Sequence, residues 1–241
     1  MQAYIQTTPE GDYFNVNAYV AADGFRQLGW EVIKFEKVEA LTTADPAAIL
    51  VGGIGIVRKR LQQLGIAHGY EIEYPAALQP FLKRKVWQST LQEVIQQGQK
   101  DIFIKPVQTK LFKGKVIRRF GDFIGLKYEE EVPVWCSEVV ELVTEWRCFV
   151  RYGELLDVRR YAGDWDSRLD LEIVKAAIAA YKEQPAAYGL DFGVDAQGEH
   201  YLVEVNDGHS LGTYGTWPIS YAKFLSARWA ELTKTEDLLN F

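Results

Sequence analysis

The chain has 241 residues, of which 48% are hydrophobic, 25% charged and 13% aromatic. This composition is typical of a folded globular protein and excludes a disordered, fibrous or collagen-like chain. The formal net charge of −6 argues against a protein whose main task is to hold DNA or RNA, because phosphate backbones are bound by basic surfaces. A local basic cluster can still serve a nucleotide.

The cysteines and the first residues bear on the cellular compartment. Cys136 and Cys148 lie in apolar segments typical of reduced, buried thiols, and two cysteines are too few for a disulfide framework. Residues 1–14 have the pattern of neither a secretory signal nor a transit peptide. No apolar run approaches the roughly 18 residues that a membrane helix requires. We therefore expect a cytoplasmic protein with neither a membrane nor a nucleic acid as partner.

The first part of the chain alternates strand-like and helix-like segments. Strands are predicted at 3–6, 31–35 and 49–51, and helices at 15–28 and after the glycine-rich residues 52–55. This order favours a small parallel sheet. The run GGIG at 52–55 lacks the spacing of a dinucleotide-binding loop, because Arg58 stands where the third glycine would be. We predict a tight strand-to-helix turn there instead.

The pattern changes near residues 70–85, where a linker with a short helix is predicted. Further along, strands are predicted at 102–107, 116–120, 134–140, 146–152, 155–161, 190–194 and 200–205, and helices at 90–97, 168–183 and 218–232. The fold class is therefore α+β, in two domains. A small α/β domain is expected over 1–80 and a larger one over 81–241, which divides into subdomains 81–136 and 137–241.

A polar hairpin closes the larger domain. Residues 195–198 have the composition of a tight turn between two strands. With an even-length loop, Asp191 falls opposite Leu202, and both point to the same face as Glu204 and Asn206.

Two interpretations of these polar residues are open. Carboxylate and amide oxygens on one face suit Mg²⁺, which also takes oxygens from substrate phosphates. Alternatively, the hairpin lies at an exposed edge and its polar residues face solvent. The apolar Tyr201, Val203 and Val205 on the opposite face favour the metal site.

Cations occur in apolar strands. Lys105 lies in the segment IFIKPV and needs an anionic partner, which is either a structural carboxylate or a phosphate. Arg147 lies in TEWRCFV, where its planar fork suits a phosphate or carboxylate. The adjacent Arg159 and Arg160 must face opposite sides of their strand, and we favour Arg159 as the one that faces the site. Surface charge is the alternative for either.

A strand lysine, a glutamate-bearing connector, a strand arginine and an Asp…Glu-x-Asn set, in this order, resemble the ATP-grasp superfamily. The likeness covers roughly residues 84–215. Its most specific part, Glu204-Val205-Asn206 with Asp191 upstream, is similar to RimK-type carboxylate–amine ligases and to a compact clade of amidoligases. The resemblance implies an ATP-grasp fold, in which two α+β subdomains clasp Mg-ATP between them. A small N-terminal domain precedes them in the sequence.

The resemblance also implies a nucleotide site. Lys105 matches the lysine that contacts the α- and β-phosphates. Glu138 and Val140 lie in a hinge over 137–141 and match backbone groups that meet adenine. Either Glu141 or Glu145 matches the residue that holds the ribose.

The same pattern implies a reaction centre. Arg147 matches the arginine that reaches the γ-phosphate or an acyl phosphate, and Asp191, Glu204 and Asn206 match the metal ligands. The family's glycine-rich phosphate loop is replaced here by a shorter basic stretch, 109–121. In it Gly114 is flanked by Lys113 and Lys115, which are further candidates for phosphate contacts.

The expected function is therefore an ATP- and Mg²⁺-dependent ligase that forms an acyl phosphate and joins it to an amine. Its partners would be ATP, a carboxylate and an amine of unknown identity, including a peptide or protein. The alternatives are a phosphotransferase on the same fold, a nucleotide-binding module without turnover, and a structural domain with a polar hairpin. His209 follows the metal ligands and is either a base or an incidental loop residue.

Overall fold

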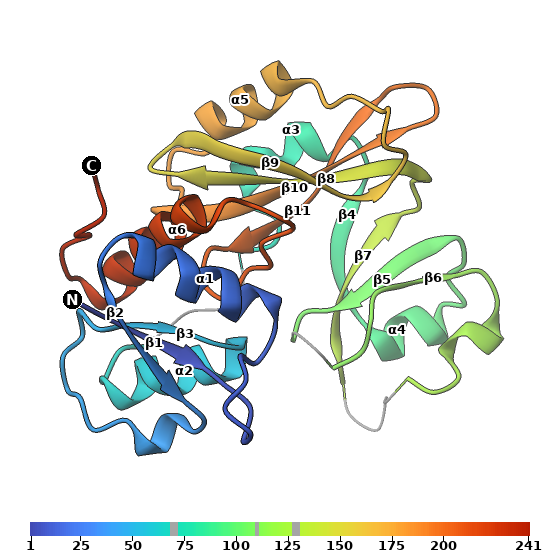
Figure 1. Cartoon of the computed structure of the whole chain (residues 1–241). Coiled ribbons are helices and arrows are strands. Elements are labelled where there is room, and N and C mark those ends of the chain that lie inside the picture. Colours follow the sequence, from blue (N-terminus) through green and yellow to red (C-terminus); the bar gives the residue numbers. More distant parts are fainter. Residues whose placement is uncertain (68–71, 109–110, 127–130) are drawn as a thin grey trace.

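The computed structural model describes residues 1–67, 72–108, 111–126 and 131–241. In these ranges the strands form one three-stranded parallel sheet and two four-stranded antiparallel sheets, with helices packed on each (Figure 1). The predicted α+β class with a parallel N-terminal sheet is confirmed. Among the described helices, none combines the length and the hydropathy needed to cross a membrane.

The N-terminal sheet has the strand order β2-β1-β3. Its elements are β1 (Gln2–Gln6), α1 (Val16–Gln27), β2 (Glu31–Phe35), the 3₁₀ helix η1 (Val38–Ala40), β3 (Ile49–Val51) and α2 (Ile54–Gln63). Asn15 caps α1 by accepting from the Ala18 amide at 3.0 Å. Gly53 precedes α2, and its amide donates to Gln6 Oε1 at 2.8 Å. The predicted strand-to-helix turn is confirmed.

Helices cover both faces of this first sheet. α1 lies beside α6 (Pro218–Thr233) on one face, and α2 lies on the other (Figure 1). Phe25, Tyr221, Phe224 and Trp229 are buried in this core. The C-terminal helix therefore completes the core of the N-terminal sheet.

A second, larger sheet has the order β11-β10-β8-β9. Its strands are β8 (Leu142–Arg151), β9 (Glu154–Gly163), β10 (Ala187–Asp195) and β11 (His200–Asp207). One face packs on α5 (Leu171–Ala180) and on two short linker helices, η2 (Ala76–Leu78) and α3 (Gln79–Leu82). The predicted helix over 168–183 is shorter because Asp170 caps it at the Glu172 amide.

The third sheet has the order β4-β7-β5-β6. Its elements are β4 (Val86–Thr90), α4 (Leu91–Gln96), β5 (Ile102–Pro106), β6 (Lys115–Ile117), η3 (Phe120–Phe123) and β7 (Pro133–Glu138). The predicted strand over 116–120 is wrong in its second half. Asp122 Oδ2 accepts from the amides of Arg118 and Arg119, which turns the chain into η3.

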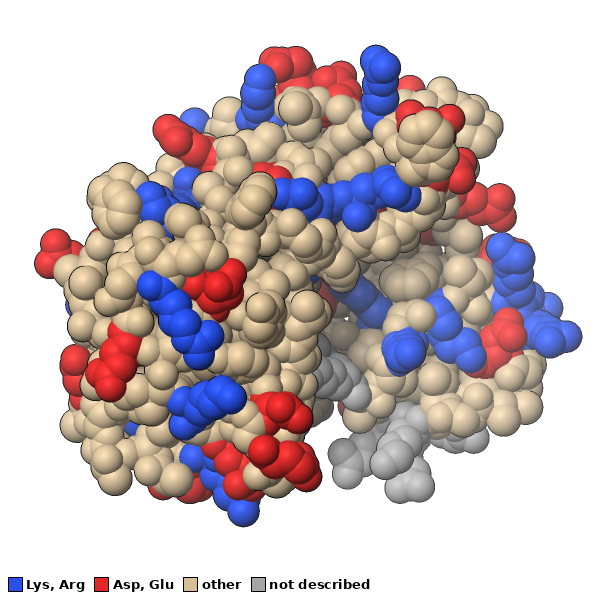
Figure 2. Space-filling view, viewed as in Figure 1, with Lys and Arg blue, Asp and Glu red and all other residues tan. Residues whose placement is uncertain are grey.

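Packing does not follow the order of the chain. The linker helices η2 and α3 pack with the large sheet, and α6 packs with the N-terminal sheet. A hollow separates the N-terminal sheet from the β4–β7 sheet (Figure 2). Side chains of all three parts line the cavities there.

Candidate active site

The turn between β10 and β11 decides which polar residues share a face. The Asp195 amide donates to the Glu199 carbonyl at 3.1 Å, and Gly198 has a φ of +83°, so the loop has three residues. The predicted loop had an even length. A three-residue loop alone would place Asp191 and Glu204 on opposite faces, because side chains alternate along a strand.

A β-bulge in β11 reverses that effect. Phe192 pairs with Leu202, whereas Asp191 pairs with Glu204, so Val203 is the extra residue. The prediction that Asp191 faces Leu202 on the polar side is wrong. Leu202 is buried in the core beneath α5, and Val203 lines a cavity on the polar side instead. Asp191 and Glu204 still share one face.

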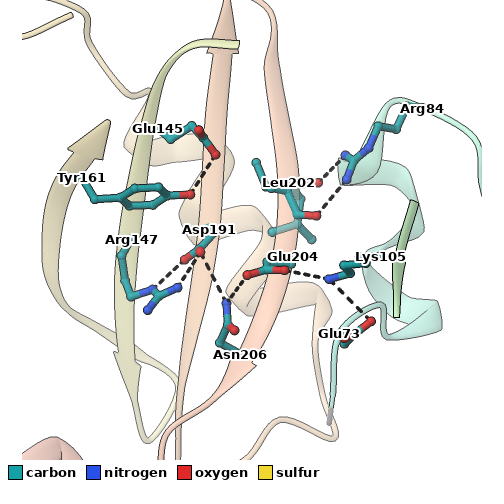
Figure 3. A network of polar contacts seen from close by, with 11 residues as sticks. Glu73, Arg84, Lys105, Glu145, Arg147, Tyr161, Asp191, Leu202, Glu204 and Asn206 are labelled. Atoms are coloured by element: carbon teal, nitrogen blue, oxygen red, sulfur yellow. Dashed lines mark hydrogen bonds and ion pairs between the residues drawn. The ribbon is translucent and has the colours of Figure 1, made fainter. Parts of the chain in front are cut away.

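The three proposed metal ligands lie together on this face (Figure 3). Asn206 Nδ2 donates to Glu204 Oε1 at 3.0 Å and lies 3.4 Å from Asp191 Oδ2. Two carboxylates and one amide fit Mg²⁺, which keeps several waters and takes phosphate oxygens. The described residues include no group of three acidic, histidine or cysteine ligands that would form a closed metal cage.

Lys105 reaches this cluster from β5. Its Nζ lies 2.7 Å from Glu204 Oε2 and 3.5 Å from Glu73 Oε2, and 4.7 Å from the ring centroid of Tyr74. Its side chain is only 12% exposed. Burial alone lowers the pKa of Lys105, but the Glu204 and Glu73 carboxylates outweigh it and raise the pKa. The predicted anionic partner exists within the protein.

Arg147 lies on β8, directly beside Asp191. Its Nε and Nη2 donate to the two Asp191 oxygens at 2.7 and 2.6 Å, and both side chains are buried. Its guanidinium lies over the Tyr214 ring, which stacks on Tyr161. Burial raises the pKa of Asp191 to about 6, although the Arg147 fork opposes this change. A chain of contacts thus joins Arg147, Asp191, Asn206, Glu204, Lys105 and Glu73 (Figure 3).

The structure separates the two adjacent arginines of β9. Arg159 pairs with Arg147 across the ladder, so its side chain shares the face of the cluster, where its Nε donates to Asp157 at 2.8 Å. Arg160 faces the opposite side, is exposed, and donates to the Gly163 carbonyl. Of these two arginines, only Arg159 lies on the face of the proposed site.

A cavity of about 220 Å³ lies against the hinge between β7 and β8. Val140 lines it, together with Phe103, Val139 and Leu142. Glu138 also lines this cavity, and of its two backbone groups only the carbonyl can still meet a base. Its amide donates to the Lys85 carbonyl at 3.1 Å, and its carbonyl accepts from Ser137 Oγ.

The structure also distinguishes the two ribose candidates. Glu145 lines the hinge cavity and accepts from the Tyr161 hydroxyl at 2.8 Å. Burial raises the pKa of Tyr161, as do the Asp191 and Glu145 carboxylates, so the hydroxyl stays a donor at neutral pH. Glu141 is 89% exposed and lies 3.6 Å from Arg118, outside the cavity.

The basic stretch after β5 passes close to Lys105. A Cβ on Gly114 would lie 2.5 Å from the Phe103 ring, so the chain approaches this ring closely. Lys113 is exposed, and Lys115 donates to the Asp122 carbonyl. Among the described residues, neither of these two predicted phosphate contacts lines the cavities that include Lys105. Residues 109 and 110 of this stretch lie outside the described residues.

A second cavity, of about 230 Å³, shares Lys105 and Glu204 with the first. Its other walls include Arg58 on α2 and His209 and Ser210 in the loop after β11. The two cavities therefore meet at one ion pair.

The loop after β11 is anchored by a buried ion-pair network. Asp207 accepts from Arg228 Nε and Nη2 at 2.7 and 2.6 Å, and its Oδ1 lies 2.8 Å from His209 Nδ1. Burial alone raises the pKa of Asp207, but the bonds from Arg228 and His209 outweigh it and lower the pKa.

Sequence reasoning missed several residues that lie at the site, namely Glu73, Arg84, Tyr161, Tyr214 and Arg228. Arg228 is on α6, where the sequence pattern does not distinguish it from a polar surface residue. Glu73 lies in the linker, where no periodic pattern predicts its neighbours. The sequence does contain one signal for Arg228. Asp207 follows Asn206 directly, and a carboxylate at the buried end of an apolar strand needs a cation.

Three solved structures are similar in fold. D-cycloserine synthetase DcsG aligns with a TM-score of 0.60 at 11% identity, over 95% of this chain and 100% of that one. D-alanine–D-alanine ligase from Bacillus anthracis complexed with ATP aligns at 0.55 and 14%, over 97% and 96%. Macrocyclase MdnC, bound with precursor peptide MdnA from Microcystis aeruginosa MRC, aligns at 0.55 and 12%, over 93% and 99%. At these identities the likeness shows the fold alone.

Sequence comparison with curated proteins gives no match. Residues 81–224, more than half of the chain, match the sequence model described as ATP-grasp domain, R-two-K clade family 2. The matched range contains Lys105, Arg147 and the β10–β11 hairpin. Together with the similar structures, the match confirms the resemblance drawn from the sequence and the ATP-grasp fold. The chain therefore belongs to the ATP-grasp family, in family 2 of the R-two-K clade.

Proposed function

We propose that the protein is an ATP- and magnesium-dependent ligase that joins a carboxylate to an amine through an acyl phosphate. The observation that carries the proposal is the position of Lys105 and Glu204 in the shared wall of two cavities. One cavity lies against the hinge and is walled mainly by apolar side chains, whereas polar groups make up a larger share of the other. A nucleotide in the first and a second substrate in the other would meet at this wall.

The hinge cavity suits a nucleoside. Val139 and Val140 would contact the base, and Glu145 would accept from the ribose hydroxyls. Lys105 stands at the far side of this cavity, where its ammonium would bind the phosphates. A phosphate oxygen would then replace a Glu204 oxygen as its partner.

Asp191, Glu204 and Asn206 would hold the magnesium ion, which when bound supplies charge neutralisation between the β- and γ-phosphates. Arg147 and Arg159 would bind and orient the transferred phosphoryl group from the β8–β9 side. Arg147 is held at its Nε and Nη2 by Asp191 and against the Tyr214 ring, so its fork has a fixed orientation.

The charged cavity suits the carboxylate substrate. A carboxylate oxygen attacks the γ-phosphorus and ADP leaves with the bridging oxygen. The amine nitrogen then attacks the acyl carbon, inorganic phosphate leaves, and the amine loses one proton. Arg58 on α2 would bind an anionic group of the substrate. Similar folds occur in structures described as D-alanine ligase and as ligases complexed with precursor peptides, so we propose an amino acid or a peptide carboxylate as the substrate class.

The test has two stages. ATP or ADP at millimolar concentration with Mg²⁺ should raise the melting temperature, because a ligand that binds only the folded state stabilises it by mass action. Incubation with ATP, amino acids and peptides should then yield ADP, phosphate and an amide. Mass spectrometry detects the amide. If the nucleotides do not raise the melting temperature, the proposal is contradicted. A phosphorylated product without an amide identifies a phosphotransferase instead.

A further inference from the structure

The bulge in β11 is held by a residue from outside the sheet. β11 is an edge strand, and Arg84 from the linker lies against its open side. Arg84 Nη1 donates to the Leu202 carbonyl at 2.7 Å, and Nη2 donates to the Val203 carbonyl at 2.8 Å (Figure 3). Consecutive carbonyls point to opposite edges of a regular strand. One guanidinium can therefore bind both only where the strand bulges.

The same linker holds β11 on the other side of Glu204. The Val205 amide donates to the Glu73 carbonyl at 2.9 Å, in an isolated bridge outside the named strands. Glu204 is therefore flanked by two linker contacts, one at Val203 and one at Val205. Arg84 Nη1 also contacts the Leu82 carbonyl at 3.2 Å, which fixes the guanidinium relative to α3.

We propose that Arg84 is a positioning residue that holds the β11 bulge and thereby keeps the Glu204 carboxylate on the metal-binding face. This inference rests on the proposed function, because it assigns Glu204 to the magnesium site. The three-residue hairpin loop would direct Glu204 to the opposite face if the bulge were lost. Lysine cannot replace Arg84, because a single ammonium does not reproduce the planar fork that binds two carbonyls.

The experiment compares nucleotide binding with and without Mg²⁺. The variants are Arg84→Met, Arg84→Lys and the control Lys83→Met, which removes a neighbouring cation whose ion pair with Glu199 lies at the surface. ADP affinity is titrated in excess Mg²⁺ and in EDTA, and the ratio of the two dissociation constants is the readout. Outer residues that orient metal ligands change metal affinity by about 10- to 100-fold, so we expect both Arg84 variants to lose roughly tenfold or more of the Mg²⁺ enhancement. Lys83→Met should keep it.

A readout without metal or nucleotide accompanies the titration. Hydrogen exchange at the amides of residues 203–205 should become faster in both Arg84 variants, because the bulge loses its anchor. If Arg84→Met does not fold, Arg84→Lys, which retains the charge, decides the question. An unchanged Mg²⁺ enhancement in the folded variant overturns the inference. A wild-type protein without any Mg²⁺-dependent ADP binding contradicts the proposed function instead, so the two failures are distinguishable.

Discussion

Lys105 and Arg147 each contact a carboxylate that is also a proposed magnesium ligand. The distances are 2.7 Å from Lys105 Nζ to Glu204 and 2.6 Å from Arg147 Nη2 to Asp191. Buried charges are stable only when they are paired. Binding of magnesium and phosphate would therefore exchange partners within the site, so that the charges are paired both before and after binding.

Substitution of Lys105 tests its role at the shared wall. Lys105→Ala leaves the Glu204 and Glu73 carboxylates without their ammonium, and loss of one partner of a buried pair costs about 3–5 kcal/mol. We expect a lower melting temperature and loss of ATP hydrolysis. The control Lys105→Met/Glu204→Gln removes both charges of the shorter pair and should regain part of the stability, because Glu73 stays charged, without regaining activity. Unchanged nucleotide affinity in Lys105→Ala would reduce the lysine to a structural ion pair.

Arg147→Lys tests the geometry of the fork. A lysine keeps the charge but cannot make the two parallel bonds that Arg147 makes to Asp191. Loss of one preorganised donor lowers turnover by about 100-fold or more, and we expect this loss in steady-state ADP release. Arg160→Lys, on the opposite face of β9, is the matched control and should be close to wild type. Normal turnover of Arg147→Lys would refute the proposed role.

The β10–β11 hairpin shows what a strand pattern can predict. Alternation predicts the apolar and polar faces, and the turn residues predict the hairpin. The bulge cannot be predicted in this way, because Arg84, which binds it, is 118 and 119 positions from Leu202 and Val203. The prediction rested instead on an even-length loop and no bulge. The correct prediction for Asp191 and Glu204 therefore resulted from two omissions that cancel.

The hinge gives a second example at the scale of elements. The backbone of Glu138 is predicted to bind a base, but its amide donates to the Lys85 carbonyl. This bond extends the pairing of β7 with β4, a strand that was not predicted because its sequence VWQST lacks a clear apolar alternation. Alternation did predict that Arg159 and Arg160 face opposite ways. The choice between Glu141 and Glu145 depends on where β8 begins, which periodicity does not fix.

The hairpin turn can be tested through its backbone. Gly198 has a φ of +83°, and a Cβ there would meet no atom within 4 Å, so only the backbone conformation opposes a side chain. Gly198→Ala should lower the free energy of unfolding by about 1 kcal/mol. Gly121→Ala, in equally open space without a positive φ, should be neutral or slightly stabilising. Urea unfolding measures both, and equal effects would contradict the turn geometry.

At the scale of the whole molecule, Asp207 links the site to α6. Its pKa is lowered because the bonds from Arg228 and His209 outweigh the effect of burial. The folded protein therefore binds fewer protons than the unfolded chain, so this stabilisation is present above about pH 4 and is lost as the pH falls below it.

Asp207→Asn should lower the free energy of unfolding at pH 7 by about 1.5–3 kcal/mol, because it removes the charge-assisted bonds to Nε and Nη2 of Arg228, whose Nη1 keeps the Glu231 carboxylate. The difference from wild type should shrink as the pH is lowered from 5 to 3. Asp166→Asn, an exposed position, is the control and should show no such dependence. Urea unfolding across this pH range measures the effect, and a difference that stays constant down to pH 3 would contradict the lowered pKa.

The packing of α6 on the N-terminal sheet has a consequence for synthesis on the ribosome. Trp229 Nε1 donates to the Pro46 carbonyl, a contact between residues 183 positions apart, and Leu239 is buried in the same core as Ile5. α1 and α2 can cover part of the first strands as soon as they emerge, but the rest of this core waits for the last helix. Contacts between such distant residues slow folding. During elongation this surface stays exposed, and exposed apolar surface makes a nascent chain prone to aggregation until α6 has left the exit tunnel.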